Sequence, residues 1–116
     1  MKAYAIIITA AAEKDIDDIC DYVAENDSLA KANDLSIALE EKCLSLTLFP
    51  ERGRPIDAAA KFGLSGFYEL HYHAYRIIYR VFKNTVMIYG IFDNRRNLDQ
   101  LLLKRLSYAT RFYSTT

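Results

Sequence analysis

Three absences limit what this 116-residue chain can be. No stretch approaches about 18 uninterrupted apolar residues, the length that a membrane-spanning helix needs. The apolar run near the N-terminus is too short for the core of a signal peptide, and acidic residues soon follow it, so we expect a cytoplasmic protein. Repeats and low-complexity segments are also missing. The length and the 52% hydrophobic content therefore fit one domain over residues 1–116, with 110–116 as a frayed tail.

Net charge is absent too, because 15 basic and 15 acidic side chains cancel. That balance argues against a general nucleic-acid binder, which usually carries a clear positive excess. The charges are nevertheless segregated along the chain. Residues 1–50 hold four basic and ten acidic side chains, whereas residues 51–116 hold eleven basic and five acidic ones. The chain can thus present a cationic face to an acidic partner.

Cysteine is scarce, with only Cys20 and Cys43 in the chain. Each falls on the apolar face of a predicted helix, so the two side chains could become neighbours. We interpret them as reduced thiols of the core, because isolated cysteines behave as small apolar side chains in a reducing compartment. A disulfide or a redox role is the less favoured alternative.

The first half of the chain predicts one strand and two helices. Residues 2–9 form an apolar run typical of a strand, and Thr9 is placed to cap the helix that follows. A polar break at 26–28 separates this helix from a second one, which ends near residues 49–50, so the pair should form an αα-hairpin. We expect its inner stripe to include Ile16, Ile19, Leu35, Leu39 and Leu46, and the first helix to turn Glu13, Asp15, Asp17, Asp18 and Asp21 outward.

The second half predicts an antiparallel meander. Strands over 67–72, 75–82 and 85–92 are joined by the two-residue turns 73–74 and 83–84, after a turn-rich connection at 51–55. An amphipathic helix over about 97–108 completes the order β-α-α-β-β-β-α, an α+β fold in which the αα-hairpin packs on a small, antiparallel-rich sheet. In the middle strand, alternation divides the side chains between two faces, with Arg76, Ile78, Arg80 and Phe82 on one face and Tyr75, Ile77, Tyr79 and Val81 on the other.

This order of elements carries a family resemblance. The acid-rich helix at 12–19, the connection at 49–55, the strand at 75–81 and the exit at 95–98 occur together and in sequence. In this combination the chain resembles the RelE/ParE superfamily of bacterial type II toxins over roughly residues 2–103. The resemblance implies a small toxin of a toxin-antitoxin system, concerned with growth regulation or plasmid maintenance. It also implies a cognate antitoxin whose extended and helical C-terminal segment wraps the toxin.

The superfamily combines two activities on one fold, so the residues must decide between them. RelE-type members cleave messenger RNA in the ribosome, and two of their arginines match Arg76 and Arg96. The lysines of the best-known ribonucleases fall at Phe67 and Glu69, and their terminal-helix tyrosine falls at Leu102. An apolar ring or a carboxylate cannot stabilise a phosphorane, and leucine cannot transfer a proton, so the full ribonuclease site is missing.

Other residues near these positions leave alternatives open. His71 and His73 could supply acid-base chemistry in principle, but both lie at a strand end where a solvated or hydrogen-bonded histidine is the simpler interpretation. ParE-like sequences often have a histidine just after the last strand, and this chain has Asp93 there. That carboxylate could form an ion pair with Arg95 or Arg96.

We therefore predict a ParE-like toxin that inhibits DNA gyrase by binding, with no cofactor and no metal. One alternative is a ribosome-dependent endonuclease that uses Arg76 and Arg96 with a rearranged proton donor, and another is a non-toxic relative that retains only antitoxin binding. The candidate target-binding residues are Arg76, Arg80, Arg95 and Arg96, although Arg76 and Arg80 could instead be structural partners of Glu69. The candidate antitoxin-binding residues are Tyr75 and Tyr79 on the aromatic sheet and Asp17 and Asp21 on the acidic helix face.

Overall fold

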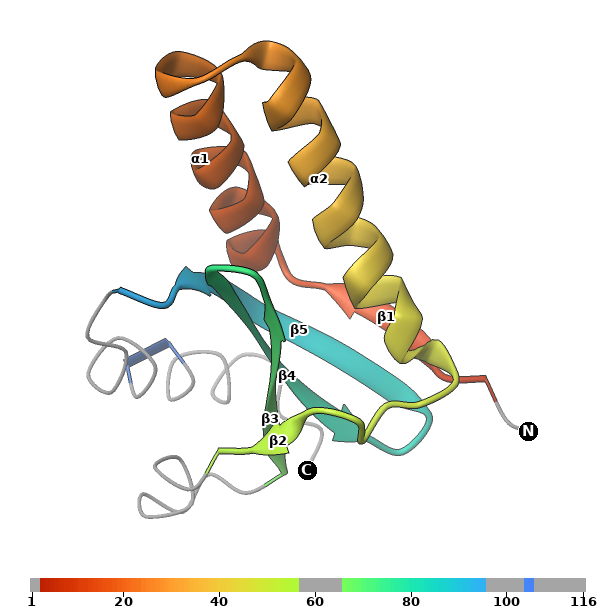
Figure 1. Ribbon diagram of the computed structural model, residues 1–116. Coiled ribbons are helices and arrows are strands. Elements are labelled where there is room, and N and C mark those ends of the chain that lie inside the picture. Colours follow the sequence, from red (N-terminus) through yellow and green to blue (C-terminus); the bar gives the residue numbers. More distant parts are fainter. Residues whose placement is uncertain (1–2, 57–65, 96–103, 106–116) are drawn as a thin grey trace.

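The computed structural model describes residues 3–56, 66–95 and 104–105, and in these residues two helices pack on one face of a mixed sheet (Figure 1). Helices α1 (Ala10–Asn26) and α2 (Leu29–Leu44) form the predicted αα-hairpin, and its turn projects away from the sheet. A short 3-10 helix, Ser45–Thr47, follows α2. The predicted α+β fold with its helical hairpin is confirmed. The predicted terminal helix falls almost entirely outside the described residues.

The described sheet has the strand order β1-β5-β4-β3-β2. Its strands are β1 (Ala5–Ile8), β2 (Arg54–Pro55), β3 (Phe67–Tyr72), β4 (Tyr75–Phe82) and β5 (Thr85–Asp93). The last three form the predicted antiparallel meander. Strand β1 runs parallel to β5, and β2 adds a short edge to β3, where the sequence predicted only a connection.

Both helix starts are capped by hydroxyl side chains, as the sequence predicted for Thr9 and for the polar break before α2. Thr9 Oγ1 accepts a hydrogen bond from Ala12 N at 3.2 Å and donates one to Ile88 O at 2.9 Å. Ser28 Oγ accepts from Lys31 N at 3.1 Å. The first cap also joins the start of α1 to β5, which fixes where the helix leaves the sheet.

The hydrophobic core lies between the helical hairpin and the sheet. Ile16, Leu39 and Leu46 are buried as predicted, whereas Ile19 and Leu35 are only half-buried at the margin of the core. On β4, the core face is the one predicted from alternation, with Tyr75, Ile77, Tyr79 and Val81 turned toward the helices. Cys43 is buried, Cys20 is half-buried, and both are free thiols. In the described part of the chain, no helix has the length and apolar character to cross a bilayer.

A β-bulge interrupts the β4–β5 ladder. The register shifts between Ile78 and Tyr79, which leaves Tyr89 as an extra residue on β5. The next residue, Gly90, has no room for a side chain, because a Cβ there would lie 2.6 Å from the ring of Phe92. Beyond Ile8, β1 no longer covers this part of β5, so its edge needs other partners.

Asp15 and Arg105 supply those partners. Asp15 Oδ2 accepts hydrogen bonds from Ile91 N at 3.0 Å and from Arg105 Nη1 at 2.9 Å, and Asp15 Oδ1 accepts from Arg105 Nη2 at 3.3 Å. Arg105 Nη1 also donates to Tyr89 O at 3.1 Å, and its guanidinium lies over the ring of Phe92. The prediction that Asp15 points outward with its acidic neighbours is therefore wrong, because the bulged strand edge offers it an unpaired N–H.

Candidate functional site

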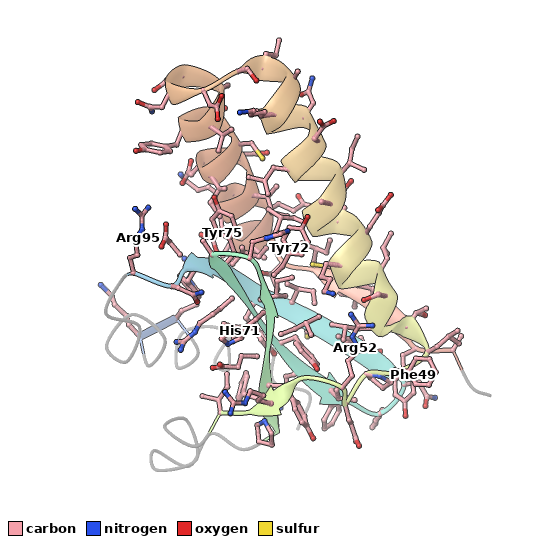
Figure 2. The ribbon with its side chains drawn as sticks, in the orientation of Figure 1. Phe49, Arg52, His71, Tyr72, Tyr75 and Arg95 are labelled. Carbon is pink, nitrogen blue, oxygen red and sulfur yellow. The ribbon has the colours of Figure 1, made fainter. Side chains whose placement is uncertain are left out.

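The predicted arginines divide between two regions of the structure. Arg76 and Arg80 lie on the face of β4 that is turned away from the helices, and Arg95 follows the end of β5. In Figure 2, Arg95 and Tyr75 lie beside α1, while Arg52 and Phe49 lie at the opposite side of the sheet. Arg96 falls outside the described residues.

Arg80 is held by aromatic rings. Its guanidinium carbon lies 5.3 Å from the ring centroid of Phe67 and 5.7 Å from that of Phe82. Phe67 is itself buried and contacts the ring of Tyr89 at 5.4 Å between centroids. Such cation–π contacts restrict the guanidinium to a place beside the two rings, so it can present charge to a partner at a small entropic cost.

Arg76 belongs to a small polar cluster with Glu69 and His71. Glu69 Oε1 is 2.6 Å from His71 Nε2 and 3.8 Å from Arg76 Nε, so the predicted pairing of Arg76 with Glu69 is present. Arg76 Nε is buried and has no hydrogen-bond partner among the described residues. A carboxylate between an imidazole and a guanidinium can, in principle, accept a proton next to a site that stabilises negative charge. His73 lies apart from this cluster, in the β3–β4 turn, with its ring against that of Tyr72.

Arg95 and Asp93 form a bidentate ion pair, as the sequence predicted for the residues after the last strand. Arg95 Nη2 lies 2.8 Å from Asp93 Oδ2, and Arg95 Nε lies 3.1 Å from Asp93 Oδ1. The backbone N–H of Arg95 also donates to Asp93 Oδ1 at 2.8 Å. The hydrogen bonds that Arg95 donates to Asp93 raise the pKa of Arg95, yet 83% of the arginine side chain remains exposed.

The ion pair borders a groove of about 540 Å³ between α1 and the ends of the strands. Sequence reasoning missed this groove, because it joins residues far apart in the chain. The only signal was the helical spacing of the α1 residues that line it, Asp18, Ile19, Tyr22 and Val23. Of the predicted antitoxin-binding residues, Tyr75 lines the groove. Burial, followed by the nearby charge of Asp93, raises the pKa of Tyr75 and keeps its phenol protonated.

The remaining predicted antitoxin-binding residues differ in exposure. Asp17 and Asp21 are exposed on α1, next to the groove residues. Tyr79 has no exposed surface, and its hydroxyl accepts a hydrogen bond from Gly53 N at 3.0 Å. Tyr79 therefore supports the sheet from within rather than offering area to a partner. In the described ranges, no group of three or more His, Cys, Asp or Glu side chains has the proximity that a metal ion needs.

Comparisons with known proteins place this geometry in a family. The family model described as the ParE toxin of the type II toxin-antitoxin system, parDE, matches residues 6–98. Among solved structures, the chromosomal ParDE toxin-antitoxin system of P. aeruginosa matches with a TM-score of 0.68 at 20% identity, covering 78% of this chain and 96% of that chain. The RelBE2 toxin-antitoxin complex of Mycobacterium tuberculosis matches with a TM-score of 0.56 at 22% identity, covering 80% and 93%. No curated protein matches significantly.

At these identities the solved structures show a shared fold. The family model goes further, because it spans most of the chain, from the first strand to a point beyond the last. The matched residues include those that line the groove beside α1 and those of the arginine-bearing strand β4. The chain belongs to the ParE toxin family of type II toxin-antitoxin systems, within the RelE/ParE superfamily.

Proposed function

We propose that this toxin inhibits DNA gyrase by binding it, rather than by cutting RNA. The observation that carries the proposal is the packing of Phe67, which stands where the best-known ribonucleases of the superfamily have a lysine. Its ring is 3% exposed, contacts Tyr89 and supports the guanidinium of Arg80. This position therefore serves packing, and it supplies no charge for a phosphorane.

We assign the target to two neighbouring regions, Arg76 and Arg80 on β4 and Arg95 after β5, and we extend the second region to Arg96 from the sequence. Arg80 is pre-oriented by two rings, and Arg95 is held by Asp93 while most of its side chain faces solvent. Pre-oriented guanidinium groups lose little freedom when they meet carboxylates, so this surface suits an acidic patch on a protein.

We further propose that a cognate antitoxin neutralises the toxin. The two similar solved structures are themselves a ParDE system and a RelBE2 toxin-antitoxin complex, which supports a partner of the same kind for this chain. The antitoxin-binding surface is the acidic face of α1, with Asp17 and Asp21, together with the neighbouring Tyr75. Its negative charge favours basic antitoxin residues.

The deciding experiment measures supercoiling of relaxed plasmid by gyrase in the presence of the purified toxin. Inhibition is expected, together with intact ribosome-bound messenger RNA. Arg95→Ala should weaken inhibition about 10- to 100-fold if the arginine makes a desolvated, charge-assisted contact worth about 1.5–3 kcal/mol. Arg52→Ala removes an exposed arginine at the other side of the sheet and should leave inhibition unchanged. Normal supercoiling at saturating toxin would overturn the proposal.

A second candidate function rests on the cluster of Glu69, His71 and Arg76. The 2.6 Å contact between Glu69 and His71 places two groups that accept protons beside the guanidinium of Arg76. In a ribonuclease, one of them would take the proton of a 2′-hydroxyl, and Arg76 would stabilise the phosphorane. Codon-specific cuts in ribosome-bound messenger RNA that disappear in both Glu69→Gln and Arg76→Ala would favour this candidate over gyrase inhibition. Induced expression without growth arrest would instead indicate a relative that only binds its antitoxin.

A further inference from the structure

The groove beside α1 has an apolar floor and two aromatic side chains. Ile19 and Val23 of α1 form part of the floor, and Tyr75 lies at the strand side. Tyr22 stands at the helix side with 63% of its surface exposed, which is unusual for so large a ring. A volume of about 540 Å³ is enough for one long side chain and the backbone around it.

The rim of the groove is acidic. Asp18 lies on α1 and Asp93 lies at the end of β5, while Asp17 and Asp21 extend the same charge along the exposed helix face. Each rim carboxylate now has a cation from this chain. Lys14 pairs with Asp18 at 3.0 Å, and Arg95 pairs with Asp93 at 2.8 Å.

Both cations remain largely exposed to solvent while they make these pairs. The side chains of Lys14 and Arg95 are 75% and 83% exposed, respectively. An exposed pair such as that of Lys14 with Asp18 contributes little to stability. The bidentate pair of Arg95 with Asp93 would be exchanged for another bidentate pair, so an incoming guanidinium can replace Arg95 at little net cost. Asp93 itself is only 23% exposed, so a cation that reaches it from the groove would be better shielded from water than Arg95 is.

We propose that this groove receives a basic side chain of the cognate antitoxin, which stacks between Tyr22 and Tyr75 and takes Asp93 from Arg95. An arginine fits best, because a planar guanidinium can lie against aromatic rings and bind a carboxylate through two hydrogen bonds. Nucleic acid fits the groove less well, since its phosphates would face two carboxylates, Asp18 and Asp93, against one cation, Arg95, among the described residues that line it. The inference rests on the proposed antitoxin partner and names the chemistry of its contact.

The exchange has a direct effect on the toxin. An antitoxin segment seated in the groove lies next to Arg95, which we assign to the target surface. The segment would cover this arginine and displace it from the carboxylate that holds it. The antitoxin and the target would then compete for the same surface around Arg95. Binding of the antitoxin would therefore be enough to neutralise the toxin.

The test titrates the full-length toxin with the protein encoded by the adjacent reading frame, using calorimetry at low and moderate salt. Tyr22→Ala and Asp93→Asn should each raise Kd at least tenfold, and the effect of Asp93→Asn should shrink as salt increases. Asp34→Asn removes an exposed carboxylate on α2 and should bind like the parent chain. Arg95→Ala should bind as tightly as the parent or more tightly, because it removes the competing cation.

The outcomes separate this inference from the proposed function. Tight binding that is equal in the parent, Tyr22→Ala and Asp93→Asn would overturn the groove contact while leaving the antitoxin partner intact. An Arg95→Ala variant that loses affinity would show that the arginine contacts the antitoxin and is not displaced. Absence of binding by the parent chain would instead remove the proposed partner. Self-association that Tyr22→Ala abolishes, with antitoxin binding unchanged, would assign the groove to a second copy of the toxin and overturn the inference.

Discussion

At the scale of single residues, Cys43 carries the clearest consequence of burial. Its thiol lies on the buried face of α2, in the core and with no exposed surface, and desolvation raises its pKa from 9.0 to about 12. Below pH 9 the thiol is protonated in both the folded and the unfolded state. Above pH 9 only the unfolded state loses its proton, so the unfolded state is favoured increasingly up to about pH 12.

This linkage between protonation and folding predicts a measurable loss of stability at high pH. Between pH 8 and pH 10.5, the free energy of unfolding should fall by about 2 kcal/mol more in the parent chain than in Cys43→Ala. The tyrosines titrate alike in both proteins, so their contribution to the pH dependence cancels in the difference between the two free energies of unfolding. Urea unfolding under reducing conditions at the two pH values gives the difference. Equal losses in the two proteins would show that the Cys43 thiolate is tolerated in the fold.

At the scale of elements, local patterns were predictable and contacts between distant elements were not. Apolar spacing located α1 and α2, and alternation assigned the two faces of β4, because both signals lie within one segment. The ion pair of Asp93 and Arg95 was predictable for the same reason. The bulge at Tyr89 and the inward turn of Asp15 were not, since each depends on where β1 stops beside β5. The groove was missed because α1 forms one wall and the strand ends form the other.

The inward turn of Asp15 predicts a stability effect that an acidic surface residue would not have. Asp15→Asn removes the ion pair with Arg105 and weakens the acceptor of the Ile91 N–H, which should cost about 2 kcal/mol. Asp18→Asn breaks only an exposed pair with Lys14 and should leave the unfolding midpoint almost unchanged. Chemical unfolding of the two variants tests the difference, and similar midpoints would show that the Asp15 network contributes little.

At the scale of the whole molecule, the acidic and the basic side chains lie on different parts of the fold. The acidic half of the sequence forms α1 and α2, whereas in the described part of the other half Arg54, Arg76 and Arg80 lie on the sheet and Arg95 follows its last strand. A toxin with two faces of opposite sign can hold a mixed-charge antitoxin at more than one place, and the groove beside α1 is one of those places.

This arrangement predicts that the antitoxin stabilises the toxin. At a free concentration one hundred times its dissociation constant, a partner that binds only the folded state adds about 2.7 kcal/mol. For a domain of this size, such a gain raises Tm by roughly 10 °C. Thermal unfolding with and without the protein from the adjacent reading frame measures the shift. A Tm that does not change at saturating partner would count against a complex with the folded toxin.

The parallel pairing of β1 with β5 has a consequence for the protein while it is being synthesised. The contact between Thr9 and Ile88 spans 79 residues of sequence. A ribosome that adds about 5–20 residues per second releases the second of these segments roughly 4–16 seconds after the first. Until then the N-terminal strand has no neighbour, the entry to α1 is not anchored, and Arg95, which follows β5, has not been made. We therefore expect each new chain to be harmless until β5 and Arg95 have been made, which leaves antitoxin already present in the cell time to meet it.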